Sequence, residues 1–254
     1  MSGERIAMNA AEQRASVTLA GIFGLRMLGL FLLLPVLSLY AQDFPGSTPL
    51  LVGVALGAYG LTQALFQVPF GAVSDRFGRK PVIAFGLVVF AAGSVLAAMA
   101  DSMGVLILGR ILQGAGAIAS PILALISDLT REETRTRAMA MIGMTIGVSF
   151  AVSLVAGPAL AHWIGVPGIF ALTAVLALLA VGVLYLVVPD PQTVVHRRDT
   201  QVTAGLLGQV LRDPTLLRLD FGIFALHLVL TALFVVLPPL LVDEIGLATD
   251  RQWQ

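Results

Sequence analysis

The hydrophobic pattern of this 254-residue chain is a series of long apolar runs separated by short polar segments. A helix of about 20 apolar residues crosses a bilayer core of roughly 30 Å. Seven runs reach that length, and most of the charged residues lie between them. The predicted spans are residues 17–41, 51–73, 81–100, 105–127, 138–160, 168–188 and 218–242. The pattern therefore predicts an all-α polytopic membrane protein.

Composition supports this assignment and excludes several kinds of site. The chain is 57% hydrophobic and 12% charged, and its mean hydropathy of +0.94 is far above that of soluble proteins. It has no cysteine and three widely separated histidines, so neither a thiolate nor a histidine-built metal site is expected. The triplet Gly78–Arg79–Lys80 lacks the spacing of a phosphate-binding loop. We expect no catalytic residues, metal, cofactor or nucleic-acid partner, and therefore not an enzyme.

Arginine and lysine alternate along the chain, which predicts its orientation. Cytoplasmic loops of membrane proteins carry an excess of these residues. The N-terminal segment and residues 74–80, 128–137 and 189–218 contain them, whereas residues 42–50, 101–104 and 161–167 contain none. The N-terminus is therefore predicted to be cytoplasmic, in a multi-pass protein of the cell inner membrane.

The longest polar segment has six predicted spans before it and one after it. We expect residues 1–188 to form an N-terminal six-helix bundle, residues 189–217 to be a cytosolic linker, and residues 218–254 to contain the first helix of a second bundle. Transporters are often built from repeated halves. The sequence thus reads as part of a longer protein, although a seven-span protein remains an alternative.

The densest polar cluster lies between the second and third predicted spans. Glycines there permit close helix approach and tight turns, and an acid and a base four residues apart share one helical face. Its key positions are Gly71, Asp75, Arg76, Gly78, Arg79 and Lys80. These features alone predict a tight, basic turn at the cytosolic membrane edge.

Several polar residues lie at membrane depth, where a lone charge must pair or face water. Arg26, Arg110 and His227 are ionisable, and histidine titrates near neutral pH. A second group consists of Tyr59, Gln63 and Gln67, spaced four apart on one helical face, which predicts a cavity lining. The alternatives are an arginine bonded to neighbouring carbonyls, interhelical hydrogen bonds, and a packing histidine. An apolar cavity wall would come from Phe23, Leu30, Leu34, Phe66, Phe70 and Met141.

The motif from Gly71 to Lys80 resembles the signature between the second and third helices of the major facilitator superfamily. In that family the motif acid and arginine help to lock the outward-facing state, which implies this role for Asp75 and Arg79. An acid at the end of the fourth helix pairs with the motif arginine in the family, so the resemblance implies an Arg79–Asp128 contact. A charge exposed at the helix end is the alternative for Asp128.

Two further motifs extend the resemblance. Arg110 followed by Gln113–Gly114 is similar to the fourth-helix motif of proton-coupled members, which implies coupling at Arg110 and a cavity position for Gln113. Gly157–Pro158 resembles a degraded fifth-helix antiporter motif, in which Ser153 replaces a glycine. The segments 25–29 and 127–132 look closest to the YajR-type subgroup of drug:proton antiporters.

The resemblance implies a secondary transporter that exports small hydrophobic compounds against protons by alternating access. Its partners would be membrane lipid, a small-molecule substrate and protons, and the complete protein would be a monomer. Two alternatives are a facilitator of a polar metabolite, such as a sugar or amino acid, and a truncated half that transports nothing. No substrate follows from the sequence.

Overall fold

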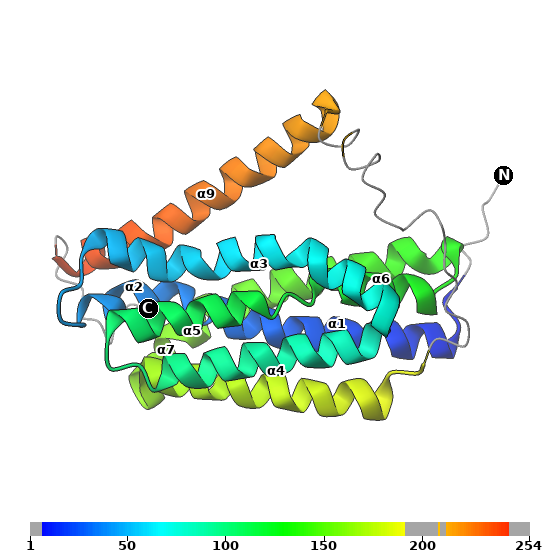
Figure 1. Ribbon diagram of the computed structural model, residues 1–254, viewed down its shortest axis with the longest axis horizontal. Helices are drawn as coiled ribbons and strands as arrows, with labels where there is room; N and C mark the ends of the chain where they lie inside the picture. The colour runs from blue at the N-terminus through cyan, green and yellow to red at the C-terminus, as the bar shows by residue number, and fades with distance from the viewer. Residues whose placement is uncertain (1–6, 191–207, 209–211, 244–254) are drawn as a thin grey trace.

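The computed structural model describes residues 7–190, 208 and 212–243, and these residues are helical with short connections (Figure 1). The helices are α1 (Ala10–Phe31), α2 (Leu34–Gln42), α3 (Pro49–Phe77), α4 (Arg79–Ala98), α5 (Met103–Ala115), α6 (Ala119–Leu129), α7 (Glu132–Val187) and α9 (Pro214–Asp243). No strand occurs in this part of the chain. The predicted all-α fold is confirmed.

Two spans contain a helix break, and one long helix contains two spans. α1 and α2 form one broken span, with the break at Leu33 just before Pro35. α5 and α6 form another, with the break at residues 116–118. The long helix α7 is divided by Gly165, whose positive φ of 70° suits glycine. With α7 counted as two, the membrane-capable helices give the seven predicted spans.

Three connections between spans are shorter than the sequence pattern predicted. The expected loop at 74–80 reduces to Gly78 between α3 and α4, with φ of 94°. The expected loop at 128–137 is largely helical, because α6 continues to Leu129 and α7 begins at Glu132. Likewise Gly165 alone interrupts the helix where a loop at 161–167 was predicted. At 74–80 and 128–137 charged residues extend the helices beyond their apolar spans, so hydropathy alone misplaces these ends.

Close packing holds α1 to α7 and places α4 against α5 and α7 (Figure 1). Their shared core includes Leu19, Phe90 and Ile122, which are almost completely buried. α4 and α5 cross so closely that a Cβ on Gly93 would lie 2.5 Å from the backbone nitrogen of Gln113. Small residues at such crossings let membrane helices approach and gain packing contacts.

Helix α9 lies apart from this bundle along most of its length (Figure 1). It packs on α2 and α3, and the ring of its Phe234 meets that of Phe150 in α7 edge to face at 6.2 Å. Pro35, Pro158 and Phe234 line a cavity of ≈ 310 Å³ there. Most of the predicted linker 189–217 and the tail after Asp243 lie outside the described residues.

Candidate functional site

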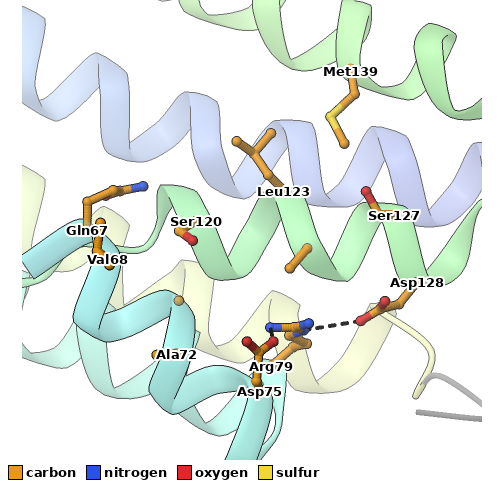
Figure 2. Close-up of a pocket in the computed structure, with 12 residues that line it drawn as sticks. Gln67, Val68, Ala72, Asp75, Arg79, Ser120, Leu123, Ser127, Asp128 and Met139 are labelled. Atoms are coloured by element: carbon orange, nitrogen blue, oxygen red, sulfur yellow. Dashed lines mark hydrogen bonds and ion pairs between the residues drawn. The ribbon is translucent and has the colours of Figure 1, made fainter. Parts of the chain in front are cut away.

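Arg79 joins three helices at the basic end of the bundle, by which we mean the end with the α3–α4 and α6–α7 connections. Its Nε donates to Asp128 Oδ2 at 3.1 Å and its Nη1 donates to Ser74 Oγ at 2.7 Å. It also forms an ion pair with Asp75, four residues earlier (Figure 2). The contact between Arg79 and Asp128, which the family resemblance implied, is confirmed. The role of these residues as a conformational switch stays a prediction.

The backbone at Gly78 explains why Arg79 reaches both acids. A positive φ turns the chain between α3 and α4 within one residue, so the first residue of α4 lies beside the last turn of α3. Asp75 comes from that turn and Asp128 from the end of α6. The three side chains are partly exposed, with 14%, 30% and 20% of the side-chain surface of Arg79, Asp75 and Asp128 accessible. Low exposure strengthens such pairs relative to surface ion pairs.

A groove of ≈ 370 Å³ leads from this cluster along α3 and α6. Gln67 lies at its far end and Asp128 at its near end (Figure 2). Gly71 lines it midway, where an added Cβ would lie 2.5 Å from Ser120 Oγ. A larger residue at position 71 would therefore require the Ser120 hydroxyl to rotate away.

Lys80 fixes the same end to α7. Its Nζ contacts Asp190 Oδ1 at 2.7 Å and donates to the Val188 carbonyl just after α7 ends. The sequence alone placed Lys80 in the motif but showed no partner for it. Arg76, the remaining basic residue of the motif, is exposed.

A second ion pair, which the sequence analysis missed, ties α1 to the start of α7. Glu12 is 4% exposed and accepts hydrogen bonds from Arg131 Nε at 2.9 Å and Thr134 Oγ1 at 3.0 Å. These contacts raise the pKa of the Arg131 guanidinium above its ordinary value, chiefly through the hydrogen bond. Asn9 followed by Glu12 is a readable capping box, but its distant partner leaves no signal in the sequence.

Arg26 lies in the interior of the bundle at the middle of its length. It is 2% exposed, and its Nη2 donates to Gln63 Oε1 at 3.0 Å and to the Gly116 carbonyl at 3.1 Å. Gly116 lies in the α5–α6 break, where helical hydrogen bonding is interrupted and a carbonyl becomes free. The broken helix thus supplies an acceptor for a buried cation.

Arg110 begins a second buried chain of polar contacts, separate from that of Arg26. Its Nη1 donates to Gln113 Oε1 at 2.7 Å, and Gln113 Nε2 donates to Ser94 Oγ at 2.7 Å. Its Nε also donates to the Ala55 carbonyl of α3 at 3.2 Å, the contact expected of a packing arginine. Ser94 completes this chain but carried no signal in the sequence. A coupling role for Arg110 and a cavity role for Gln113 stay predictions.

The three residues of the predicted polar stripe on α3 lie in three different environments. Tyr59 is 3% exposed, and its ring lies beneath both guanidinium groups, 5.7 Å from Arg26 Cζ and 4.9 Å from Arg110 Cζ. Gln63 binds Arg26. Gln67 lines the groove. The stripe is therefore partly an interhelical hydrogen-bonding surface, which was the alternative interpretation.

The remaining candidates lie away from this polar interior. His227 is exposed on α9, and its Nδ1 lies 2.8 Å from the carbonyl of Ile223 in the same helix. Gly157 packs against the α1–α2 break, where an added Cβ would lie 2.6 Å from the Leu32 carbonyl. Pro158 lines the cavity beside α9. Of the apolar wall candidates, Phe23 is buried, Phe66 is exposed, and Leu30, Leu34, Phe70 and Met141 are half-buried.

Comparison with curated proteins finds transporters. The chain is 48% identical over 97% of its length to the inner membrane transport protein YajR of Escherichia coli (strain K12), of which it covers 54%. It is 30% identical over 89% of its length to the multidrug resistance protein MdtH of Aeromonas salmonicida (strain A449), of which it covers 57%. The chain thus spans little more than half the length of these relatives.

Among solved structures, a bacterial homologue of the human lysosomal transporter Spinster, in an inward-facing and unoccupied conformation, matches with a TM-score of 0.81. The match covers 97% of this chain and 59% of that chain at 17% sequence identity, which shows a shared fold. Residues 19–252 match the family model of the Major Facilitator Superfamily. With its membrane-capable helices, its motif cluster around Arg79 and its relatives, the chain belongs to the Major Facilitator Superfamily.

Proposed function

We propose that the full-length protein exports small hydrophobic compounds in exchange for protons by alternating access. The observation that carries the proposal is the three-helix cluster of Arg79, Asp75 and Asp128. Charged pairs of this kind form in one conformation and separate in another, so they bias a two-state equilibrium. The likeness to YajR and to the multidrug resistance protein MdtH favours export.

The proposed placement is the inner membrane with the N-terminus cytoplasmic. Arg76, Arg79, Lys80 and Arg131 all lie at the basic end of the bundle, as the excess of positive charge in cytoplasmic loops requires. The cluster of Arg79, Asp75 and Asp128, which we call the latch, would then close the cytoplasmic side when the transporter faces outward. Arg110, Arg26 and His227 are the candidates for proton coupling, and the complete transporter would act as a monomer.

Transport of a polar metabolite receives less support from the site. That alternative required Tyr59, Gln63 and Gln67 to present hydrogen-bonding groups to one cavity. Tyr59 is instead buried and Gln63 is bound to Arg26, while Gln67 alone lines the groove. The apolar cavity beside α9 fits a lipophilic compound better.

Uptake of a dye by energised everted vesicles that contain the full-length protein tests the proposal, because export from the cell corresponds to accumulation in an everted vesicle. A lipophilic dye should leave the medium and accumulate in the vesicles when a proton gradient is present, and a protonophore should abolish the accumulation. Vesicles without the protein provide the baseline. Equal accumulation with and without the protonophore would contradict proton coupling, and accumulation equal to the baseline would contradict export of such compounds.

A further inference from the structure

Arg26 carries buried N–H donors that meet no acceptor among the residues that the structure describes. Within them its Nη2 alone is paired, with Gln63 Oε1 and the Gly116 carbonyl. Its Nε and Nη1 are buried without a hydrogen-bond partner in this part of the chain, and so is the hydroxyl of Tyr59. Buried polar groups in native proteins almost always have partners, because leaving one unpaired costs free energy. These donors therefore point to a group that completes them.

The charge around Arg26 is also uncompensated. Arg26 and Arg110 both lie near the ring of Tyr59, and the ring of Phe90 lies 5.5 Å from Arg26 Cζ. Ring faces attract cations but do not satisfy the in-plane N–H donors of a guanidinium. Among residues 7–190, every acidic side chain lies in a connection or in a terminal turn of a helix. No carboxylate in this range shares the depth of the two arginines.

The depth of Arg26 follows from two independent helices. Its partner Gln63 is the central residue of the 29-residue helix α3. Its other partner, Gly116, is the central residue of the 27-residue span Met103–Leu129. Transporters of repeated-half architecture bind substrate near the bilayer midplane. Arg26 lies at that level.

Among the four neighbours of Arg26 named above, one is less buried than the others. Gly116, Tyr59 and Phe90 are buried, whereas Gln63 is half-buried. Gln63 lies one turn from Gln67, which lines the groove between α3 and α6. A rotation of the Gln63 amide away from Arg26 would expose the guanidinium from the side of that groove.

We propose that Arg26, Tyr59 and Gln63 form a binding site for an anionic group, and that its ligand is the carboxylate of a small lipophilic compound. A planar carboxylate accepts two parallel N–H bonds from a guanidinium, which is the strongest pairing available to arginine. Each such pair of donors combines Nη2 with either Nε or Nη1, so the carboxylate would bind after the Gln63 amide has rotated away from Nη2. It would then supply an acceptor for one of the unpaired nitrogens together with the missing negative charge. A neutral ligand would supply only an acceptor.

Equilibrium binding to the purified full-length protein tests this assignment without any proton gradient, so its result is independent of whether the protein exports or couples to protons. Benzoate and its neutral amide, benzamide, have the same ring and differ in charge. Titrated by calorimetry in a low-chloride buffer, benzoate should bind about tenfold more tightly than benzamide, because hydrogen bonds to charged groups are the stronger ones. Equal affinities, or no binding of benzoate, would overturn the proposal.

Chloride, titrated alone, shows whether the site binds an inorganic anion or a carboxylate. Competition by chloride that leaves benzoate the tighter ligand agrees with the proposal, whereas binding of chloride without benzoate overturns the carboxylate assignment. Arg26→Gln should abolish the preference for benzoate, and the control Arg137→Gln, at an exposed arginine of α7, should retain it. Retention of the preference in Arg26→Gln would contradict the site. The wild-type ratio of the two affinities needs no variant, so the test holds even if Arg26→Gln does not fold.

Discussion

Arg79 Nε lies 3.1 Å from Asp128 Oδ2, which joins the first turn of α4 to the last turn of α6 across 49 residues of sequence. Because Asp75 and Ser74 of α3 bind the same guanidinium, one side chain couples three helices at the basic end. Any motion that separates α3 from α6 must break at least one of these contacts.

Neutralising either acid should loosen the closed basic end. We expect Asp75→Asn and Asp128→Asn in the full-length protein each to shift the outward/inward ratio toward the inward-facing state by about two- to fivefold, since partly exposed ion pairs contribute up to ~1 kcal/mol. The double variant should exceed the sum of the singles in free energy, because each single variant leaves Arg79 one acid. Alkylation of a cysteine introduced at Met139, which lines the groove, reports the opening.

Asp101→Asn is the control for that experiment, because Asp101 is exposed in the α4–α5 connection. It should leave the alkylation rate at the Met139 position unchanged. An unchanged rate in Asp75→Asn and Asp128→Asn as well would contradict the latch.

Glycine at position 114 should be essential to the packing of α5 on α3. A Cβ there would lie 2.3 Å from the backbone oxygen of Tyr59, which cannot move without displacing α3. We expect Gly114→Ala to destabilise the protein by about 1–3 kcal/mol, as overpacking does. Gly104→Ala is a matched control on the same helix, since nothing lies within 4 Å of its added Cβ. Melting in detergent measures both, and equal melting temperatures would contradict the close crossing.

Loss of the Glu12 carboxylate should detach α1 from the start of α7. Glu12→Gln leaves Arg131 without its ion pair and places an amide N–H₂ donor where two donors already point. We expect a melting temperature lower by several degrees. Glu132→Gln, at an exposed acid in the first turn of α7, should have little effect. If the two variants melt together, the buried pair does not stabilise this end.

A lysine in place of Arg110 should impair transport more than stability. The arginine binds the Ala55 carbonyl and Gln113 Oε1 through two different nitrogens, whereas the single ammonium of a lysine cannot reproduce that fork. We expect Arg110→Lys to reduce proton-driven dye efflux at least tenfold. Ser94→Ala removes only the acceptor that orients Gln113 and should reduce efflux less. Wild-type efflux in Arg110→Lys would assign this arginine to packing alone.

The site was only partly readable from the sequence. The Asp75–Arg79 spacing predicted a shared helical face. The structure contains the ion pair, but Asp75 belongs to α3 and Arg79 to α4, so the turn at Gly78 and not a continuous helix brings them together. Asp128 entered through the family resemblance alone. The partners of Glu12, Lys80 and Gln113 were missed, because each is distant in sequence.

The sequence by itself determined the membrane fold, because a bilayer requires long apolar helices with internally satisfied backbones, and hydropathy reads those directly. It also determined where arginine and lysine gather. Only the tertiary structure decided which groups contact the buried arginines. Arg26 reaches Gln63 and the carbonyl freed at Gly116, and it shares the ring of Tyr59 with Arg110. Such contacts join separate helices whose rotation and break positions are set by packing, so no local pattern encodes them.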